Sequence, residues 1–381
     1  MKKFLKKIKH IFPLFLLGGI LGWFISYILE RYIDKNECNP LITVLIFFVF
    51  LILCYQLQII LHELGHLLFG LLTGYKFISF RIGNIIWIKN NEKIVKGRYK
   101  LQGTGGQCIM LPPELKNGFV PYLWYNLGGV IINLSVSIIS ILIEKQTRSY
   151  THLSVMLLFC FALTLTGFFC AITNGIPYYS NAMVNDGYHI MSLKKSRIVQ
   201  KSYYVMLKTN ALQVKGKRIG ELPYEWFLLP EEADLSNPIN ASIRILEGNW
   251  YYDKLQFEEA RICYETLLNS SVTILNVLKR ELLCELLFFE LVSFQREEVI
   301  HSLYTKELIR YIEAMKFMIN KQKLRYACAV VIDQDLEKAN KIYTCAWQNK
   351  ENFCIKGEAE MEFEVLEWTK KYFENKKILD K

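Results

Sequence analysis

The sequence lacks the cysteine spacing of a disulfide framework or of a cysteine-ligated zinc site. Its ten cysteines, among 381 residues, stand singly with no Cys-x-x-Cys pair, so reduced thiols are expected. Charged residues are scarce at 22%, whereas 52% of the chain is hydrophobic and the mean hydropathy is +0.18. An ordinary soluble domain is therefore excluded, and the length predicts two or three domains with at least one in a membrane.

A stripe of basic and aromatic residues typical of a nucleic-acid groove is also missing. Lys and Arg outnumber Asp and Glu by 46 to 36, but the basic residues cluster beside apolar runs. We therefore expect no nucleic-acid partner and interpret the basic excess as a signal of membrane topology.

Four apolar tracts are long enough to cross a bilayer, at residues 11–29, 41–73, 122–143 and 153–173. A helical crossing needs about 20 residues. The first tract is longer than a signal-peptide core and lacks a small-residue cleavage site, so it is expected to be an uncleaved anchor, with a signal peptide as the alternative. The second would be about 50 Å long as a helix, so it either tilts and protrudes or bends.

Positive charge in the short loops predicts the orientation. Residues 75–118 carry eight Lys and Arg, against two in each of the segments 31–35 and 145–148. Because basic loops stay in the cytoplasm, both termini are expected to be cytoplasmic. The prediction is a multi-pass protein of the plasma membrane, and the Lys-, Ile- and Asn-rich composition is compatible with a bacterial cytoplasmic membrane.

The predicted fold is mainly α, a polytopic membrane bundle of about four spans with two additions. Residues 75–113 alternate apolar and polar side chains between turn residues, which predicts a small β element of two or more strands on the cytoplasmic side. After residue 194 no run long enough to cross recurs, and helical patterns fill the remainder. The expected organisation is a cytoplasmic tail and first span at 1–35, a membrane core at 36–195, a linker at 196–238 and a cytoplasmic α-helical domain at 239–381.

The C-terminal region carries weak signs of a tetratricopeptide repeat. Small and aromatic residues have that spacing, and much of the pattern recurs 79 residues later, where an insertion would have to absorb the excess over two periods. An unspecialised helical domain is the alternative. The residues concerned are Gly248, Tyr251, Ala260 and Tyr264, then Ala327, Ala339, Tyr343 and Ala346.

The strongest chemical signal is His62-Glu63-Leu64-Gly65-His66 on an apolar tract. Residues four apart lie on one face of a helix, so both imidazoles can bind one metal ion while Glu63 reaches a water beside it. The alternative is a pair of polar residues lining an inert bundle interior. Ionisable groups at membrane depth are costly and are seldom kept without a use, which favours the metal site.

A catalytic zinc usually takes three protein ligands and leaves one position for water. A third histidine six residues after the second is excluded, because position 72 is Leu72, and the next acidic residue, Glu92, lies within the strand pattern. Asp186 remains, in Asn185-Asp186-Gly187, after the fourth tract. A membrane protease with a glutamate as third ligand is kept as an alternative.

With these motifs the chain resembles the site-2 protease family of intramembrane zinc metalloproteases. That family pairs His-Glu-x-x-His with a later Asn-x-x-Pro and then Asp-Gly, and this chain has Asn174-Gly-Ile-Pro177 before Asp186-Gly187. The resemblance covers about residues 41–193 and includes no PDZ module. It departs from the family at Gly129, where a proline often follows the glycine.

The resemblance implies a zinc-dependent endopeptidase that cleaves a membrane-spanning substrate. Its ligands would be His62, His66 and Asp186 on Zn²⁺, with Glu63 as catalytic general base. Asn174 would bind the substrate backbone or the oxyanion, or it simply caps a broken helix.

The residues themselves predict where that chemistry occurs. Pro177 removes an amide donor, so the fourth helix should break near Asn174, and Gly187 permits the tight approach that brings Asp186 back toward the histidines. The site would lie inside the membrane near its cytoplasmic side. His189 is either a partner of the ligand Asp186 or an interfacial histidine.

The expected substrate is a membrane-spanning protein or peptide, either a regulator released by cleavage or a leader or peptide precursor. Strands near the glycine-rich segment 103–106 are hypothesised to bind the unwound substrate by strand addition. The helical C-terminal domain is expected to recruit a cytoplasmic protein partner. A non-catalytic membrane scaffold with structural zinc is the competing interpretation.

Overall fold

The computed structural model describes residues 39–90, 93–99, 104–115, 118–147, 154–179, 184–269, 274 and 276–379, with residues 19, 22, 23, 26 and 27. The expected first span at 11–29 lies almost wholly outside the described residues. The chain divides into two compact units, residues 1–62 with 129–173 and residues 63–128 with 174–381.

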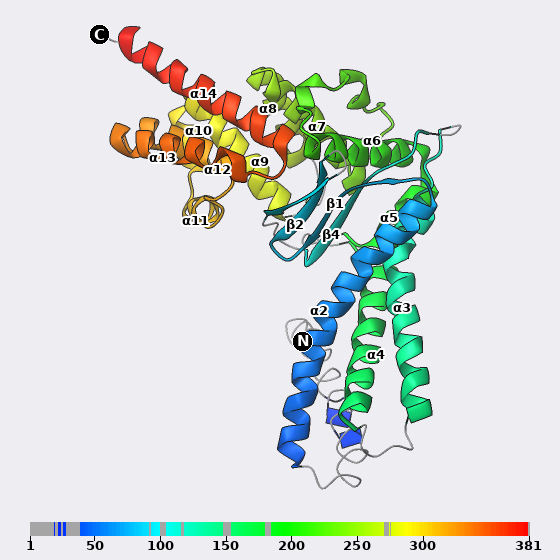
Figure 1. The fold of residues 1–381 in the computed structure, drawn as a ribbon. Coiled ribbons are helices and arrows are strands. Elements are labelled where there is room, and N and C mark those ends of the chain that lie inside the picture. The colour runs from blue at the N-terminus through cyan, green and yellow to red at the C-terminus, as the bar shows by residue number, and fades with distance from the viewer. Residues whose placement is uncertain are drawn as a thin grey trace, which may run out of the picture. The chain divides into compact units, whose positions relative to one another are not determined.

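Three long apolar helices account for most of the first unit and continue into the second. They are α2 (Pro40–Leu72), α3 (Tyr122–Thr147) and α4 (Ser154–Gly175) (Figure 1). Each is long and apolar enough to cross a membrane, by length and composition. They correspond to the second, third and fourth expected tracts, and the 33 residues of α2 form one uninterrupted helix.

Local signals fix both ends of α2. The Asn39 side chain accepts a hydrogen bond from the backbone N–H of Leu41 at 3.0 Å, as at a helix N-terminus, and Pro40 starts the helix. At the other end Gly74 has a φ of +89°, and the N–H of Tyr75 donates to the carbonyl of Gly70 at 3.0 Å. The chain then turns directly into a strand.

The core of the first unit is apolar packing between α2 and α4. Phe47 and Cys54 pack with Leu158 and Ala162, and these residues are at most 4% exposed. The outer faces of these helices stay apolar and exposed, as Leu45 and Ile52 show at more than half of their surface. Exposed apolar faces of this extent are typical of helices that contact lipid.

The second unit contains a four-stranded antiparallel sheet, which confirms the predicted β element. Its order is β3-β2-β1-β4, with a register shift in the β1 and β4 pairing between Phe77 and Ser79. Ile78, Ile86, Cys108 and Met110 are buried on it. The strands are β1 (Lys76–Ile82), β2 (Ile85–Asn90), β3 (Lys93–Arg98) and β4 (Gly106–Leu111).

Helices form the rest of the second unit, so the mainly α class is confirmed for the described residues. The α-helices are α5 (Asp186–Lys195), α6 (Arg197–Val214), α7 (Pro238–Asp253), α8 (Phe257–Asn269), α9 (Asn276–Phe289), α10 (Glu297–Leu303), α11 (Lys306–Ala314), α12 (Ile319–Val331), α13 (Leu336–Gln348) and α14 (Lys356–Leu379). Short helices are η2 (Ile219–Glu221), η3 (Tyr224–Trp226), η4 (Glu290–Phe294) and η5 (Lys350–Asn352).

Helix α6 lies inside the segment that the sequence suggested as a linker. Ser196 caps it by accepting from the N–H of Val199, and Val199, Tyr203 and Leu207 are buried on one side of it. It packs against α7 and β4. This helix is thus part of the core of the second unit.

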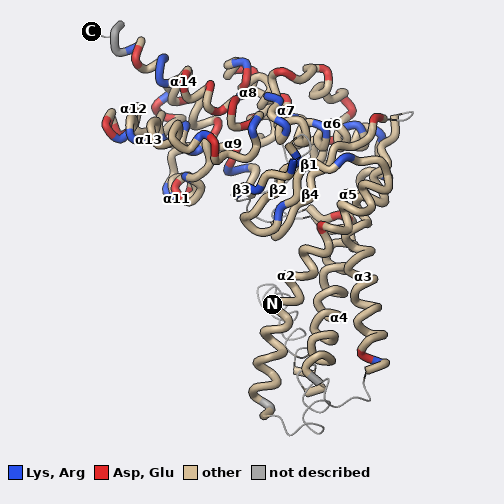
Figure 2. The backbone as a smooth tube through the Cα atoms, viewed as in Figure 1, with Lys and Arg blue, Asp and Glu red and all other residues tan. Residues whose placement is uncertain are grey.

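Charge separates the apolar helices from the rest (Figure 2). Among Asp, Glu, Lys and Arg, α2 contains only Glu63 and α4 contains none, whereas each α-helix from α6 to α14 contains at least two such residues. An ionisable residue on an apolar helix is costly, so Glu63 is a candidate functional residue.

Candidate metal centre

His62, His66 and Asp186 form a group that could hold a metal ion. Each offers one ligand atom, and these atoms lie within 4.8 Å of one another. The two histidines are 7% and 8% exposed, and Asp186 is partly buried. Both histidines stand one turn apart on the uninterrupted helix α2, which accounts for their common face.

The His66 ring is oriented by α3. Its Nδ1 lies 2.7 Å from the backbone carbonyl oxygen of Tyr125, so Nδ1 carries the proton and donates it. The Nε2 atom is then the one that could bind a metal ion, and it lies 3.4 Å from Oδ2 of Asp186. A tetrahedral ion with bonds of about 2.1 Å separates its ligands by about 3.4 Å, so this spacing fits an ion between the two side chains.

The His62 ring is oriented by a chain of amides. The Asn133 amide nitrogen donates to the backbone carbonyl of Gln58 at 2.9 Å and to its side-chain oxygen at 2.6 Å. Asn133 Oδ1 therefore accepts from Nδ1 of His62 at 2.8 Å. Gln58 in turn donates to the carbonyl of Leu163 in α4 at 3.1 Å. With this oxygen acceptor on Nδ1, Nε2 is the atom of His62 that could bind a metal ion.

Asp186 is placed by the break after α4. The helix ends at Gly175, two residues before Pro177, and the chain re-enters a helix at Asp186 with Asn185 as its N-cap. The Asn185 side chain accepts from the N–H groups of Tyr178 at 2.9 Å and Tyr188 at 3.0 Å. The carboxylate therefore stands in the first turn of a helix whose N-cap, Asn185, also bonds the backbone of Tyr178.

Close backbone approach explains three glycines around the site. A Cβ at Gly128 would lie 2.4 Å from the carbonyl oxygen of Gly65, and one at Gly129 would lie 2.4 Å from the His62 ring. A Cβ at Gly187 would lie 2.3 Å from the carbonyl oxygen of Gly175. Side chains at these positions would push α3 away from the histidines or α5 away from the end of α4.

The Glu63 side chain faces the start of β4. A Cβ on Gly106 would lie 2.5 Å from Cγ of Glu63. Arg81, only 1% exposed, donates to the carbonyls of Gly83 at 2.7 Å and Gly106 at 3.2 Å, and to Thr104. Burial lowers the pKa of Arg81, and the nearby Glu63 carboxylate opposes that shift.

Arg81, Tyr125, Asn133 and Asn185 were not singled out in the sequence analysis. The role of Asn185 could have been predicted, since Asn directly before a helical Asp-Gly is a typical N-cap. The burial of Arg81 could not, because a basic residue in an alternating strand is ordinarily exposed. Tyr125 acts through its backbone carbonyl, which no residue type reveals.

The two remaining candidates lie near the ends of α4 and α5. Asn174 is half-buried in the last turn of α4. His189 stands one turn after Asp186, its ring 5.5 Å from that of Tyr203, and burial lowers its pKa. Its Nδ1 is buried and has no hydrogen-bond partner within the described residues. His189 is not part of the His62, His66 and Asp186 group.

The sequence matches no protein-family model, and comparison with curated proteins and with solved structures finds no match. Two imidazoles with oxygen acceptors on Nδ1, together with one carboxylate, are a donor set that suits a divalent metal such as zinc.

Proposed function

We propose that this protein is a zinc-dependent intramembrane endopeptidase that cleaves a membrane-spanning segment. The observation that carries the proposal is that His62 and His66, in the second half of the apolar helix α2, meet Asp186 of α5, beside the one carboxylate of α2, Glu63. A buried three-ligand set with an adjacent carboxylate is the arrangement that metal-assisted hydrolysis requires.

The roles of the chain's own residues follow from their positions. Bound Zn²⁺ would supply a water of lowered pKa and polarise the scissile carbonyl. Glu63 accepts the proton of the attacking water on its carboxylate and delivers it to the amine nitrogen of the leaving chain. Asn133 and the Tyr125 carbonyl hold the two imidazole rings in their binding orientation.

The proposal places the site in the plasma membrane near the cytoplasmic face. The three apolar helices and the basic segment 75–118 support this orientation. A helical substrate must unwind before its peptide bond can be attacked. Strand β4, which begins at Gly106 beside Glu63, could pair with the unwound segment. Asn174 would then hydrogen-bond the unwound backbone.

Metal content and proteolysis, measured together, test the proposal. Purified wild-type protein and Glu63→Gln should contain stoichiometric zinc by mass spectrometry of the metal, whereas Asp186→Ala should lose most of it. Membrane fractions of cells carrying Glu63→Gln should accumulate a single-span precursor that wild type removes. Normal zinc content in Asp186→Ala, or identical membrane proteomes, would refute the proposed site or the proposed reaction respectively.

A further inference from the structure

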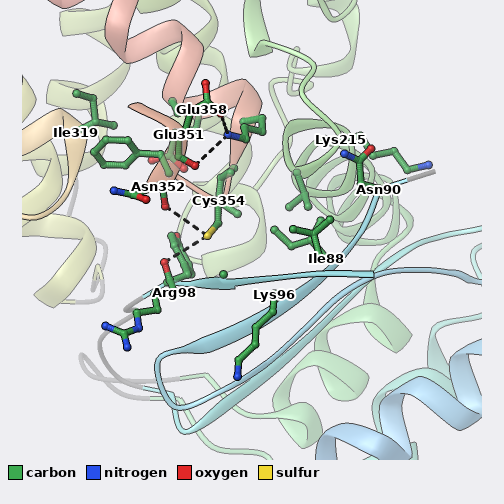
Figure 3. A pocket seen from close by; sticks show the side chains of 18 of the residues that line it. Ile88, Asn90, Lys96, Arg98, Lys215, Ile319, Glu351, Asn352, Cys354 and Glu358 are labelled. Carbon is green, nitrogen blue, oxygen red and sulfur yellow. Dashed lines mark hydrogen bonds and ion pairs between the residues drawn. The ribbon is translucent and has the colours of Figure 1, made fainter. Parts of the chain in front are cut away.

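The two faces of the β-sheet in the second unit have different surroundings. One face packs on α6, where Ile78 and Ile109 meet Val214, and a cavity of about 1710 Å³ lies over the rest of that face. Ile88 stands on the cavity side of the sheet, whereas Lys96 points to the opposite side (Figure 3). This opposite side, called the outer face below, has no role in the reaction proposed above.

The strand register shows which side chains share the outer face. Trp87 stands opposite Phe80 on β1 and opposite Lys96 on β3. Residues that face each other in a ladder point to the same side of a sheet, and alternation along each strand adds the other members. The outer face of β1, β2 and β3 comprises Phe80, Ile82, Ile85, Trp87, Lys89, Ile94, Lys96 and Arg98.

Apolar side chains on the outer face are accessible. Ile85 and Ile94 are exposed, and Phe80 and Trp87, whose ring centroids lie 6.3 Å apart, are partly exposed. These residues lie on neighbouring strands, so they form one patch and not isolated apolar positions. Such a patch marks a surface that contacts another protein or a membrane.

The charged side chains of the outer face are all basic. Lys89, Lys96 and Arg98 are exposed, and none of them forms an ion pair within the described residues. The three strands contain no Asp or Glu, and Glu92, between β2 and β3, lies outside the described residues. Trp and Ile side chains among Lys and Arg are typical of surfaces that rest on anionic lipid.

The outer face begins at the end of the apolar helix α2. Met110 of β4 points to the same side as Cys108, which stands opposite Phe80. A Cβ on Gly70 would lie 2.4 Å from the Met110 sulfur, so the face rests on the last turn of α2 at this point. Since α2 is long and apolar enough to cross a membrane, the surface of a membrane around α2 would lie near this turn.

The edge of the sheet limits how deeply the outer face can enter lipid. β3 is the terminal strand of the described sheet, so the backbone groups along its outer edge have no ladder partner there. Unpaired backbone groups are costly in hydrocarbon, whereas water reaches them in the headgroup layer. The outer face is therefore suited to the headgroup layer and not to the interior of a bilayer.

We propose that the outer face binds the anionic headgroup layer of the membrane that α2 crosses. This inference requires α2 to cross a membrane, but it does not require the proposed proteolysis. Trp87 and its apolar neighbours enter the boundary between headgroups and acyl chains, and Lys89, Lys96 and Arg98 contact phosphate groups. The contact would hold the sheet at a fixed height on the bilayer.

Photo-cross-linking at adjacent positions on the two faces tests the proposal. The full chain carrying Glu63→Gln and either Ile94→benzoylphenylalanine or Val95→benzoylphenylalanine is reconstituted in vesicles of phosphatidylcholine, with or without phosphatidylglycerol. Ile94 lies on the outer face and is 63% exposed, whereas Val95 lies on the cavity face and is 53% exposed. The two probes therefore differ in face and little in accessibility.

Mass spectrometry of the cross-linked protein gives the lipid adducts at each position. We expect the adduct yield at position 94 to exceed that at position 95 by about fivefold or more, and to rise when phosphatidylglycerol is present. Equal yields at the two positions, or a yield that does not depend on phosphatidylglycerol, would overturn the proposal. Adducts at position 94 that consist mainly of protein would overturn it too, because a protein partner would then cover this face.

Charge reversal on the outer face supplies a second comparison. Lys96→Glu combined with Arg98→Glu should lower the lipid adduct yield at position 94 by about fivefold or more in vesicles with phosphatidylglycerol. Lys279→Glu combined with Lys306→Glu makes the same change of net charge on exposed parts of α9 and α11 and should leave the yield within about twofold. An equal loss in both double variants would contradict a role for the outer face.

A milder pair of substitutions guards against misfolding. Lys96→Gln combined with Arg98→Gln removes the two charges without reversing them and should give an intermediate loss of lipid adducts. Hydrogen exchange in β1 and β2 reports whether the sheet stays folded, and a folded Gln variant with the wild-type adduct yield would overturn the proposal. Lipid adducts at position 94, in a protein that removes no membrane precursor, would support this surface and refute only the protease.

Discussion

Two clusters of buried polar side chains in this protein satisfy their hydrogen-bonding groups in different ways. Among the apolar helices, Gln58, Asn133, Ser137 and Thr164 join through amide and hydroxyl hydrogen bonds and carry no charge. In the C-terminal helices the completely buried Lys321 and Lys323 pair with Glu281, Glu285 and Glu362. The first cluster is neutral and the second is a network of full charges.

The difference follows from the surroundings of each cluster. The apolar helices are long and apolar enough to cross a membrane, where a full charge costs about 3 kcal/mol or more on insertion, so neutral amides suit them better than charged groups. In the C-terminal helices, which contain many charged residues, paired charges can be buried at folding if each has several partners. Lys323 contacts Glu285 at 2.8 Å, Glu362 at 3.1 Å and the Tyr252 hydroxyl at 2.5 Å.

Breaking the charged cluster should have the largest effect on stability. Lys323→Met removes the cation that contacts both Glu285 and Glu362. We therefore expect the free energy of unfolding of the helices around α12 to fall by about 3 to 5 kcal/mol. Hydrogen exchange measured by mass spectrometry should show faster exchange in α12 and α14, with α3 and α4 unchanged.

The exposed pair of Lys341 and Glu337 offers the control for that experiment. Both side chains are more than two thirds exposed. Lys341→Met should therefore change the opening free energy of α13, derived from hydrogen exchange, by less than about 1 kcal/mol. If Lys323→Met lowers stability no more than Lys341→Met does, the buried network contributes little to the stability of these helices.

Breaking the neutral cluster should affect metal binding more than folding. Asn133→Leu removes the acceptor for Nδ1 of His62, and loss of such a partner typically weakens metal affinity by about 10- to 100-fold. Zinc affinity measured by competition with a chelator checks this. Ser137→Ala removes a neighbouring hydroxyl that does not touch the histidine and should keep wild-type affinity. Equal affinities in the two variants would contradict a role for Asn133 in orienting His62.

A smaller, pH-dependent effect is expected at Glu358. Burial first, and then the nearby Glu362 and Glu281, raise its pKa from 4.5 to about 7, while Lys321 opposes this. Because the folded-state pKa is the higher one, this group favours folding most below about pH 4.5, and that contribution is lost as pH rises toward 7.

Glu358→Gln should therefore stabilise the C-terminal helices by on the order of 2 kcal/mol at pH 8 and by little at pH 4. Thermal denaturation at the two pH values measures the difference. A gain of the same size at both values would mean that the carboxyl does not titrate differently in the folded chain.

Much of the fold followed from short-range patterns. Apolar length predicted α2, α3 and α4, and alternation predicted strands between residues 75 and 113. The linker expectation missed α6, although Ser196 gives a cap signal, because the prolines and glycines that follow it dominated the interpretation. Turn residues mark where a helix ends, but they do not exclude a buried helix just before them.

The sequence by itself determined the features that depend on neighbours along the chain. His62 and His66 share a face because a helix repeats every 3.6 residues, and Pro177 ends α4 because it has no N–H to donate. Two features depend on how distant segments pack: the hydrogen bond from His66 to the Tyr125 carbonyl and the burial of Arg81. The cavity over β2 and β3 is a third. These features join segments far apart in sequence, and only packing sets which backbone groups and charges meet across such distances.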